Sequence, residues 1–150
     1  MAMAPGHATS WAEHARCVLA ETNHHTGAAR RALLDLLDGQ TCALSAIEIE
    51  DALRARERPV ARASIYRILD ELERLRLVHK LQIGQATARY EPVRTGDGHH
   101  HHLVCDTCGT VTPFSDPDVE IAIKKLSRRV PMRVAEHEIV LHGACRHCST

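Results

Sequence analysis

Apolar residues recur at helical spacing through the first half of the chain, and start and stop signals bound the segments. Asp38-Gly39 ends the second segment, Ser45-Ala46-Ile47-Glu48 has the form of a capping box, and Pro59 separates the third segment from the fourth. The fourth segment carries the clearest stripe, from Ile65 to Leu75. The predicted helices are Ser10 to Glu21, Ala28 to Leu37, Ser45 to Arg56 and Arg62 to Arg76.

The pattern then changes to alternation, which is typical of strands. Leu77 to Ile83 alternates, Gly84-Gln85 forms a turn, and Arg89-Tyr90-Glu91 returns, so we expect a β-hairpin. Helices followed by a hairpin are the plan of a winged helix-turn-helix, in which the last helix enters the major groove of DNA. Near the start of that helix, Arg62, Tyr66 and Arg67 are the candidate DNA contacts.

A second alternating pattern begins after a polar linker at residues 94–98, which predicts domains at 1–93 and 99–150. We expect a strand from His100 to Cys105, another from Thr110 to Phe114, and a third from Arg133 to Leu141. A helix capped by Ser115 or Asp116 is expected to reach Arg129, with its apolar side inward at Val119, Ile123 and Leu126. The whole chain is therefore predicted to be α+β, and the exposed edge of the small second sheet favours pairing with another copy.

Composition limits the possible functions. The formal net charge is zero with histidines neutral, so overall basicity gives no argument for nucleic-acid binding. Local charge does, because seven arginines lie between Arg54 and Arg76. For Arg74 and Arg76 we prefer another reading, in which they pair with Glu71 and Glu73 on a solvated helix face. No apolar run is long enough to span a membrane, and no signal peptide precedes the helices, which predicts a cytoplasmic protein.

Two Cys-x-x-Cys turns carry the strongest chemical signal. Cys105 and Cys108 form one and Cys145 and Cys148 the other, and together they supply the four sulfurs of a closed tetrahedral zinc site. Gly109 follows the first turn and allows a tight backbone there. Disulfides or unrelated redox motifs are the alternatives, and a reducing compartment disfavours disulfides. A coordinatively full site is expected to stabilise the fold and not to catalyse.

Four consecutive histidines, His99 to His102, precede the first cysteine turn. Because side chains alternate along a strand, His100 and His102 point one way and His99 and His101 the other. Two imidazoles at this spacing are a natural pair of ligands for a first-row metal. One strand could thus serve two metal sites, and a solvated loop is the alternative.

Taken together, these motifs resemble the ferric uptake regulator family from about Gly27 to Cys148. The matching pieces are Ser45-Ala46, Ser64-Ile65-Tyr66-Arg67, Leu77-Val78, Arg89-Tyr90-Glu91, the HHHHLVCDTCG segment and the final HGACRHC segment. The resemblance implies a homodimeric, metal-dependent bacterial repressor of palindromic operator DNA, with a winged-helix domain followed by a dimerisation domain.

The resemblance also implies three metal sites and a set of DNA contacts. Structural zinc falls on the four cysteines. A regulatory site falls on His79, Glu91, His100 and His102, and a third site on His99, His101, Glu120 and His137. The DNA contacts fall on Arg62, Ser64, Tyr66 and Arg67.

Three positions depart from the family pattern. Iron sensors usually have histidine where this chain has Ala43 and an acid where it has Pro113, so an iron- or peroxide-sensing repressor becomes the alternative. Zinc sensors often have cysteine where this chain has Glu91, but His79 completes a tetrahedral zinc shell, and we favour zinc as the regulatory metal. Ile47 stands where some relatives have a DNA-contacting tyrosine.

Two other classes of protein remain to be compared. A metalloenzyme with His100, His102, Glu120 and His137 around its metal would resemble a cupin, but the helical first half does not fit a barrel, and catalysis needs an open coordination position. A zinc-ribbon module that binds only protein would fail on every DNA duplex, with or without zinc.

Overall fold

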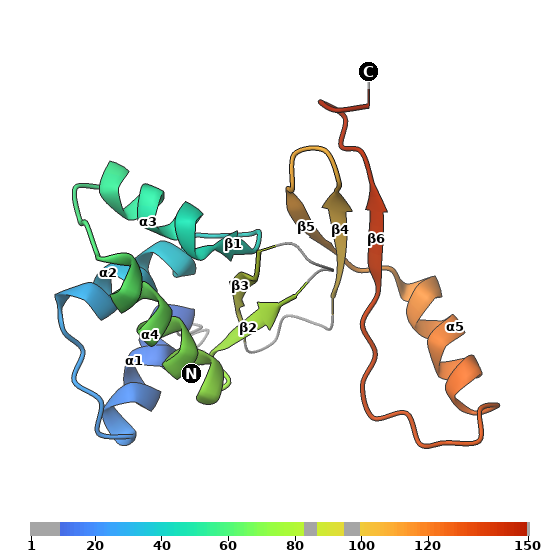
Figure 1. Ribbon diagram of the computed structural model, residues 1–150. Coiled ribbons are helices and arrows are strands. Elements are labelled where there is room, and N and C mark those ends of the chain that lie inside the picture. Colours follow the sequence, from blue (N-terminus) through green and yellow to red (C-terminus); the bar gives the residue numbers. More distant parts are fainter. Residues whose placement is uncertain (1–9, 83–86, 95–99, 150) are drawn as a thin grey trace, which may run out of the picture. The chain divides into compact units, whose positions relative to one another are not determined.

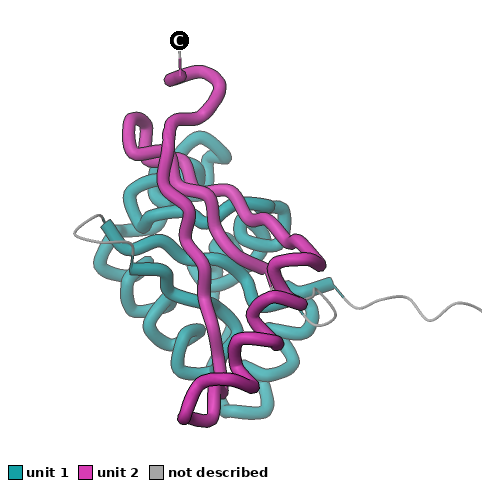
Figure 2. The backbone as a smooth tube through the Cα atoms, turned by 90° about the vertical axis from the view of Figure 1, so that its right-hand side faces the viewer, with its two compact units in different colours: residues 1–95 teal, residues 96–150 magenta. Residues whose placement is uncertain are grey.

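The computed structural model describes residues 10–82, 87–94 and 100–149. The chain forms two compact units, residues 1–95 and 96–150, shown in teal and magenta in Figure 2. The predicted turn at Gly84-Gln85, most of the predicted 94–98 linker, and His99 lie outside the described residues. Across the described ranges, no helix combines the length and apolar character that crossing a membrane requires.

Four helices and a small sheet make up the first unit (Figure 1). The helices are α1 (Trp11–Glu21), α2 (Ala28–Asp38), α3 (Ala46–Ala55) and α4 (Arg62–Arg74). The capping box predicted at Ser45 is present: its hydroxyl accepts from the Glu48 amide, and the Glu48 carboxylate accepts from the Ser45 amide. Ser10 and Glu13 cap α1 in the same way. These caps satisfy amides that a helix start leaves without partners, and so fix where α1 and α3 begin.

The apolar stripes of the four helices meet in one core. On α4, Ile65, Leu69 and Leu72 are fully buried, as the stripe predicted, while Leu75 at the end of the helix is only partly buried. Trp11, the only tryptophan of the chain, packs into the same core, and its indole N–H donates to the Leu77 carbonyl at 3.0 Å. The position and orientation of α4 are therefore set by its buried face.

The sheet of the first unit has the order β1-β3-β2. Its strands are β1 (Leu44–Ser45), β2 (Val78–Leu81) and β3 (Arg89–Pro92), and β2 and β3 form the predicted hairpin. The antiparallel register places His79 directly opposite Glu91. Side chains of directly opposed residues lie on one face of the sheet, so these two are neighbours.

The second unit consists of one helix and a three-stranded sheet of order β5-β4-β6. The strands are β4 (His101–Cys105), β5 (Val111–Phe114) and β6 (Val140–Gly143). β4 pairs antiparallel with β5 and parallel with β6. Because β4 and β6 run in the same direction, the two cysteine turns that follow them emerge at the same end of the sheet.

The prediction of a long third strand from Arg133 was wrong. β6 begins only at Val140, which pairs with His102 near the start of β4. Since β4 itself begins at His101, the residues before Val140 have little of it to pair with. Just before β6, two hydrogen bonds join Ile139 to the start of β4. The Ile139 carbonyl accepts from the His102 amide, and the Ile139 amide donates to the His101 ring.

The helix α5 (Pro117–Ser127) also differs from its prediction. Asp116 caps it, accepting from the amides of Asp118 and Val119, but the helix ends two residues before Arg129. The expectation that Leu126 points inward was wrong: its side chain is 48% exposed, and α5 has no buried residue. A sheet of three short strands is too small to cover an apolar helix face.

Candidate metal centres and nucleic-acid interface

The two cysteine turns lie together in the second unit. The thiol sulfurs of Cys105, Cys108, Cys145 and Cys148 are all within 4.8 Å of one another, and the Sγ atoms of Cys108 and Cys145 are 3.8 Å apart. Four sulfurs about 2.3 Å from a tetrahedral zinc ion would be separated by about 3.8 Å. Gly109, directly after the first turn, has a φ of 75°, which glycine adopts without strain. The spacing of the four sulfurs therefore fits zinc.

Backbone amides make this cluster favourable for thiolates. The amides of Cys108 and Cys145 donate to the Cys105 sulfur at 3.5 and 3.3 Å, and they lower the pKa of that thiol to about 6. The Thr110 hydroxyl and amide lower the pKa of Cys108. The neighbouring thiols, Cys145 first, raise the pKa of Cys148 to about 12. Four sulfurs this close cannot all ionise without a cation, and a bound divalent metal ordinarily supplies the positive charge that stabilises the thiolates.

A second cluster brings together His101 on β4, Glu120 on α5 and His137 in the segment before β6. The His101 Nε2 lies 2.7 Å from one Glu120 carboxylate oxygen, and the His137 Nε2 lies 3.2 Å from the other. His101 is fully buried. These are three of the four residues predicted for the third metal site, and the fourth, His99, lies outside the described residues.

The proton on His101 can be assigned from its neighbours. The Ile139 amide, which can only donate, lies 3.2 Å from the His101 Nδ1. The neutral ring therefore carries its proton on Nε2, from which it donates to Glu120.

The residues predicted for the regulatory site occur as one pair in each unit. His79 and Glu91 are opposed across the β2–β3 hairpin of the first unit. In the second unit, the rings of His100 and His102 are 5.2 Å apart, centroid to centroid. His102 is buried, and its Nδ1 lies 3.7 Å from a Glu138 carboxylate oxygen. The contacts of His101 and His102 with different partners agree with the expected alternation of faces.

All four predicted DNA-contacting residues lie on α4. Tyr66 and Arg67 are exposed, although Tyr66 is a large side chain. Arg67 donates to the Ser64 hydroxyl at 3.2 Å. The guanidinium of Arg62 is held by the Glu50 carboxylate of α3 at 2.6 Å. The first turns of α4 thus present arginines whose positions are set by neighbouring side chains.

Sequence reasoning misassigned the partners of Glu71. The predicted pairing of Glu71 with Arg74 or Arg76 on a solvated face was wrong, because Glu71 is buried and binds Arg30 and His24 instead. These partners lie more than forty residues away in sequence, and no local pattern marks them. The only available signal was a carboxylate on the apolar side of a helical repeat.

The comparisons with known proteins agree on one family. A family model described as the ferric uptake regulator family matches residues 21–142. The ferric uptake regulation protein of Bordetella parapertussis is 36% identical over 105 residues, which cover 70% of this chain and 74% of the relative. The protein of the same name from Bacillus subtilis is 30% identical over 115 residues, covering 76% and 77%.

Solved structures give the same fold. The Helicobacter pylori ferric uptake regulator superposes with a TM-score of 0.80 at 24% identity, covering 94% of this chain and 93% of that one. The Vibrio cholerae ferric uptake regulator superposes with a TM-score of 0.75 at 25% identity, covering 87% and 98%. The predicted fold class, a helical DNA-binding domain followed by a small α/β domain, is confirmed.

Proposed function

Since this chain belongs to the ferric uptake regulator family, and is thus a metal-responsive transcriptional regulator and not an enzyme, we propose that it is a zinc-sensing repressor that binds palindromic operator DNA as a homodimer. One observation supports the choice of sensing site: the residues predicted for it fall as one pair in each unit, His79 opposite Glu91 and His100 beside His102. Its work on operator DNA would place it in the cytoplasm.

The donor set favours zinc. Three imidazoles and one carboxylate are a common tetrahedral zinc shell, whereas oxygen-rich, six-coordinate sites suit harder metals. Ala43, at the position where iron sensors usually have histidine, is buried and apolar and offers no ligand. The four cysteines would hold a second, structural zinc, and their full coordination leaves no position for a sensed ion.

The cluster of His101, Glu120 and His137 supports this division of roles. A histidine that binds metal through one ring nitrogen ordinarily donates its other N–H to an acceptor. The second nitrogen of His101 instead accepts from the Ile139 amide, and its Nε2 proton occupies the contact with Glu120. A metal bound there would have to displace that proton, so we assign sensing to the other set and a weaker metal affinity to this one.

Sensing would act through the angle between the units. His79 and Glu91 belong to one unit and His100 and His102 to the other, so closing around one ion would restrict that angle. In a dimer the angle sets the separation of two α4 helices, which DNA requires to be about 34 Å, one helical turn, or a multiple of it. Metal binding by these residues would shift the population toward the DNA-binding form only by as much as their affinity for metal is higher in that form than in the other.

Dimerisation is assigned to the second unit. Leu103 on β4 and Leu141 on β6 are neighbours in the parallel register and are 41% and 50% exposed. Ile121 and Leu126 on α5 are exposed to a similar degree. Several exposed apolar side chains on so small a unit are typical of an association surface.

A second candidate function is iron sensing, because the curated relatives carry the name ferric uptake regulation protein. The same experiment tests both. Selection from a pool of random duplexes in the presence of zinc would identify the operator. Fluorescence anisotropy would then measure its affinity with zinc, iron(II) or manganese(II). We expect zinc to raise the affinity about 5- to 150-fold, the ordinary range of coupling between two binding sites.

The variant His100→Ala should abolish the zinc stimulation and keep the zinc bound by the cysteines, whereas His25→Ala, an exposed histidine of the first unit, should behave as wild type. Stronger stimulation by iron than by zinc would favour the second candidate. Full stimulation in His100→Ala would remove that residue from the sensing site, and failure to enrich any duplex would overturn the repressor function itself.

A further inference from the structure

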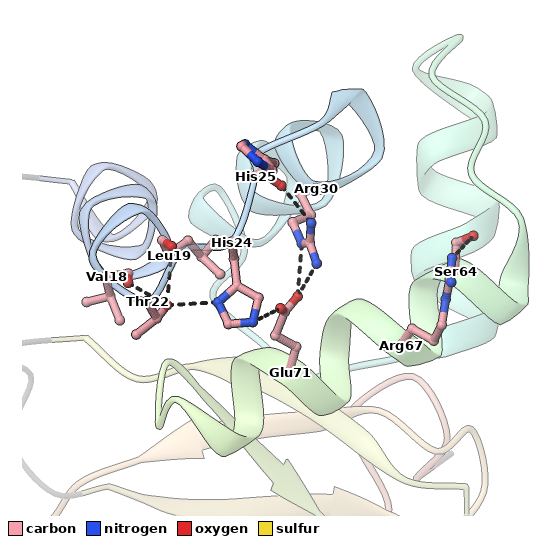
Figure 3. Close-up of polar contacts among 9 residues, drawn as sticks. All are labelled: Val18, Leu19, Thr22, His24, His25, Arg30, Ser64, Arg67 and Glu71. Carbon is pink, nitrogen blue, oxygen red and sulfur yellow. Dashed lines mark hydrogen bonds and ion pairs between the residues drawn. The ribbon is translucent and has the colours of Figure 1, made fainter.

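Glu71 is a buried carboxylate on α4, one helical turn after Arg67. Its side chain is 7% exposed, and its two oxygens are bound by different parts of the first unit. The His24 Nε2, from the connection between α1 and α2, lies 2.7 Å from Oε1. The Arg30 guanidinium of α2 donates to Oε2 from Nε at 2.9 Å and from Nη2 at 2.6 Å. Figure 3 shows these contacts meeting at the carboxylate of Glu71.

The opposite nitrogen of His24 meets a hydroxyl whose proton is already used. Thr22 Oγ1 donates to the Val18 carbonyl at 2.8 Å, with the Leu19 carbonyl at 3.2 Å. A hydroxyl has only one proton to give, so it accepts from the His24 Nδ1, 2.9 Å away. The Nε2 faces a carboxylate and donates as well. Both ring nitrogens are donors only in the imidazolium, so this geometry fits a positively charged His24.

Arg30 supplies a permanent charge to the same carboxylate. Its Nη1 donates to the His25 carbonyl at 2.6 Å, so the guanidinium is held by the loop that carries His24. Arginine keeps its proton at every pH at which proteins are folded, whereas histidine changes charge between about pH 5 and 8. Of these two residue types only histidine changes charge in that range, so any pH dependence of the Glu71 contacts would act through His24.

Other charged groups near the cluster lie on α4. Arg67, Asp70 and Arg74 line the same hollow as Arg30 and Glu71, between α4 and the first turn of α2. The groups that meet the His24 ring directly are Glu71 from α4 and Thr22 from the end of α1. The hollow contains a predicted DNA contact, Arg67, one turn before Glu71, so a change in how Glu71 is held acts close to the DNA-reading surface.

We propose that His24, Glu71 and Arg30 form a proton-dependent latch that positions α4 for DNA, with His24 as the positioning residue that makes the latch sensitive to pH. The proposal rests on the proposed function in that α4 is taken as the DNA-reading helix. The buried apolar face of α4 sets its overall orientation, and Glu71 adds a polar tie from α4 to α2 and to the preceding loop, one turn from Arg67.

The direction of the pH effect follows from the two donors. Below the pH at which His24 loses its proton, both ring bonds and the charge pair with Glu71 are present. Above it, the neutral ring keeps one proton. If that proton stays on Nε2 for Glu71, the Thr22 hydroxyl must give up a carbonyl to bind Nδ1, or leave Nδ1 without a donor. The latch is therefore stronger at acid pH and weaker at alkaline pH.

The test compares the full-length wild type with His24→Gln, whose amide can donate to Glu71 at any pH but cannot ionise. His25→Gln is the matched control, since only the backbone carbonyl of that neighbour joins the cluster. Both variants keep every proposed metal ligand, so pH effects on metal binding cancel in the ratio to wild type. Measurements would run from pH 5.5 to 8.5 in saturating zinc.

The first readout is hydrogen exchange of the α4 amides, which requires no DNA. We expect the exchange ratio of His24→Gln to wild type to fall by about three- to tenfold from acid to alkaline pH, the range for one charge-assisted hydrogen bond at a partly exposed site. His25→Gln should show no such change. In a Glu71→Gln background the His24→Gln change should lose its pH dependence. A flat ratio in the wild-type background would overturn the latch.

The second readout is the operator affinity of the same proteins. The ratio of the operator affinity of wild type to that of His24→Gln should rise by a similar factor as the pH falls. A pH-dependent exchange ratio with an unchanged affinity ratio would overturn the role in DNA binding and leave the latch as a local device. If wild type binds no duplex at any pH, the proposed function fails, and the exchange ratio still decides whether the latch exists.

Discussion

The two units of this protein have different kinds of interior. The first buries leucine, isoleucine and alanine from four helices, together with Trp11 and Tyr90. In the described part of the second unit, the buried side chains are His101, His102, Cys105 and Val111. Three of these four carry metal-binding groups. The same residues that make the second unit chemically distinctive also occupy the place where a core would be.

This difference shows what each unit needs in order to be stable. A fully buried leucine contributes roughly 1.5–3 kcal/mol from removal of its surface from water, and the first unit has many of them. The second unit has few, and its helix α5 leaves Ile121 and Leu126 exposed. Its stability should therefore come from bound metal and from a partner subunit, as in other domains too small to build a core.

The largest expected effect tests this dependence on metal. Cys105→Ser removes the most buried of the four sulfurs and the acceptor of two backbone amides. Zinc binding by such clusters is worth about 10–16 kcal/mol, more than a small domain's whole stability, so its loss should unfold the second unit. Elemental analysis should show one zinc fewer per chain, and hydrogen exchange should show that β4 and β6 lose their protection.

The first unit supplies an internal reference for that experiment. Trp11 is the only tryptophan and lies in the core of the first unit, so its fluorescence reports the unfolding of that unit alone. It should be unchanged in Cys105→Ser. Cys17→Ser, at an exposed cysteine of α1, is the matched control and should keep all its zinc. Retained zinc together with protected β4 and β6 amides in Cys105→Ser would contradict the structural role of the cluster.

A smaller effect is expected for a substitution in the apolar core of the first unit. Leu69→Ala removes a fully buried side chain from α4 and should lower the free energy of unfolding of the first unit by about 2–5 kcal/mol, from lost burial and the cavity that remains. Denaturant unfolding followed by Trp11 fluorescence measures it. Ile47→Ala, at a side chain 45% exposed on α3, should change it by less than about 0.5 kcal/mol.

Zinc content decides how that result is interpreted. If the units are held by separate means, Leu69→Ala should lose stability and keep its full complement of cysteine-bound zinc. Loss of zinc in proportion to the loss of stability would show that the cysteine cluster depends on the first unit. The inference that the two units are stabilised by separate means would then be wrong.

The sequence predicted best where one short segment contained the whole cause of a structure. The capping box at Ser45 needs only four residues, and each cysteine turn needs four. The α4 stripe is likewise local, since every third or fourth residue determines which face is buried. That the two cysteine turns come together could be predicted without knowledge of the fold, because a structural zinc ion is ordinarily bound by four ligands such as cysteine thiolates.

Prediction failed where the cause was distant in sequence. The length of β6 is set by where β4 begins, at His101, which is distant in sequence, and nothing near Arg133 indicates this. The partners of Glu71 come from α2 and the loop before it, so the assumption that Glu71 pairs with arginines of its own helix placed that carboxylate in solvent. Leu126 looked like a core residue because its spacing is correct, but the sheet it would cover is too small.

The smallest expected effect concerns an ion pair at the surface of the first unit. Asp35 on α2 accepts from Arg58 at 2.9 Å and from Arg16 at 2.7 Å, and these guanidinium groups, Arg58 first, hold the pKa of its carboxyl below the ordinary value. A depressed carboxyl pKa contributes stability above the unfolded value near 3.9, and this is lost as pH falls through the folded value. Asp35→Asn should therefore lower the free energy of unfolding at neutral pH, by less than about 1 kcal/mol because the side chains are 39–42% exposed. Trp11 fluorescence should show the difference from wild type shrinking below about pH 4. If the difference in free energy of unfolding persisted undiminished at pH 2, Asp35 would act through its shape and hydrogen bonds. Its charge would then contribute nothing to the stability of this unit.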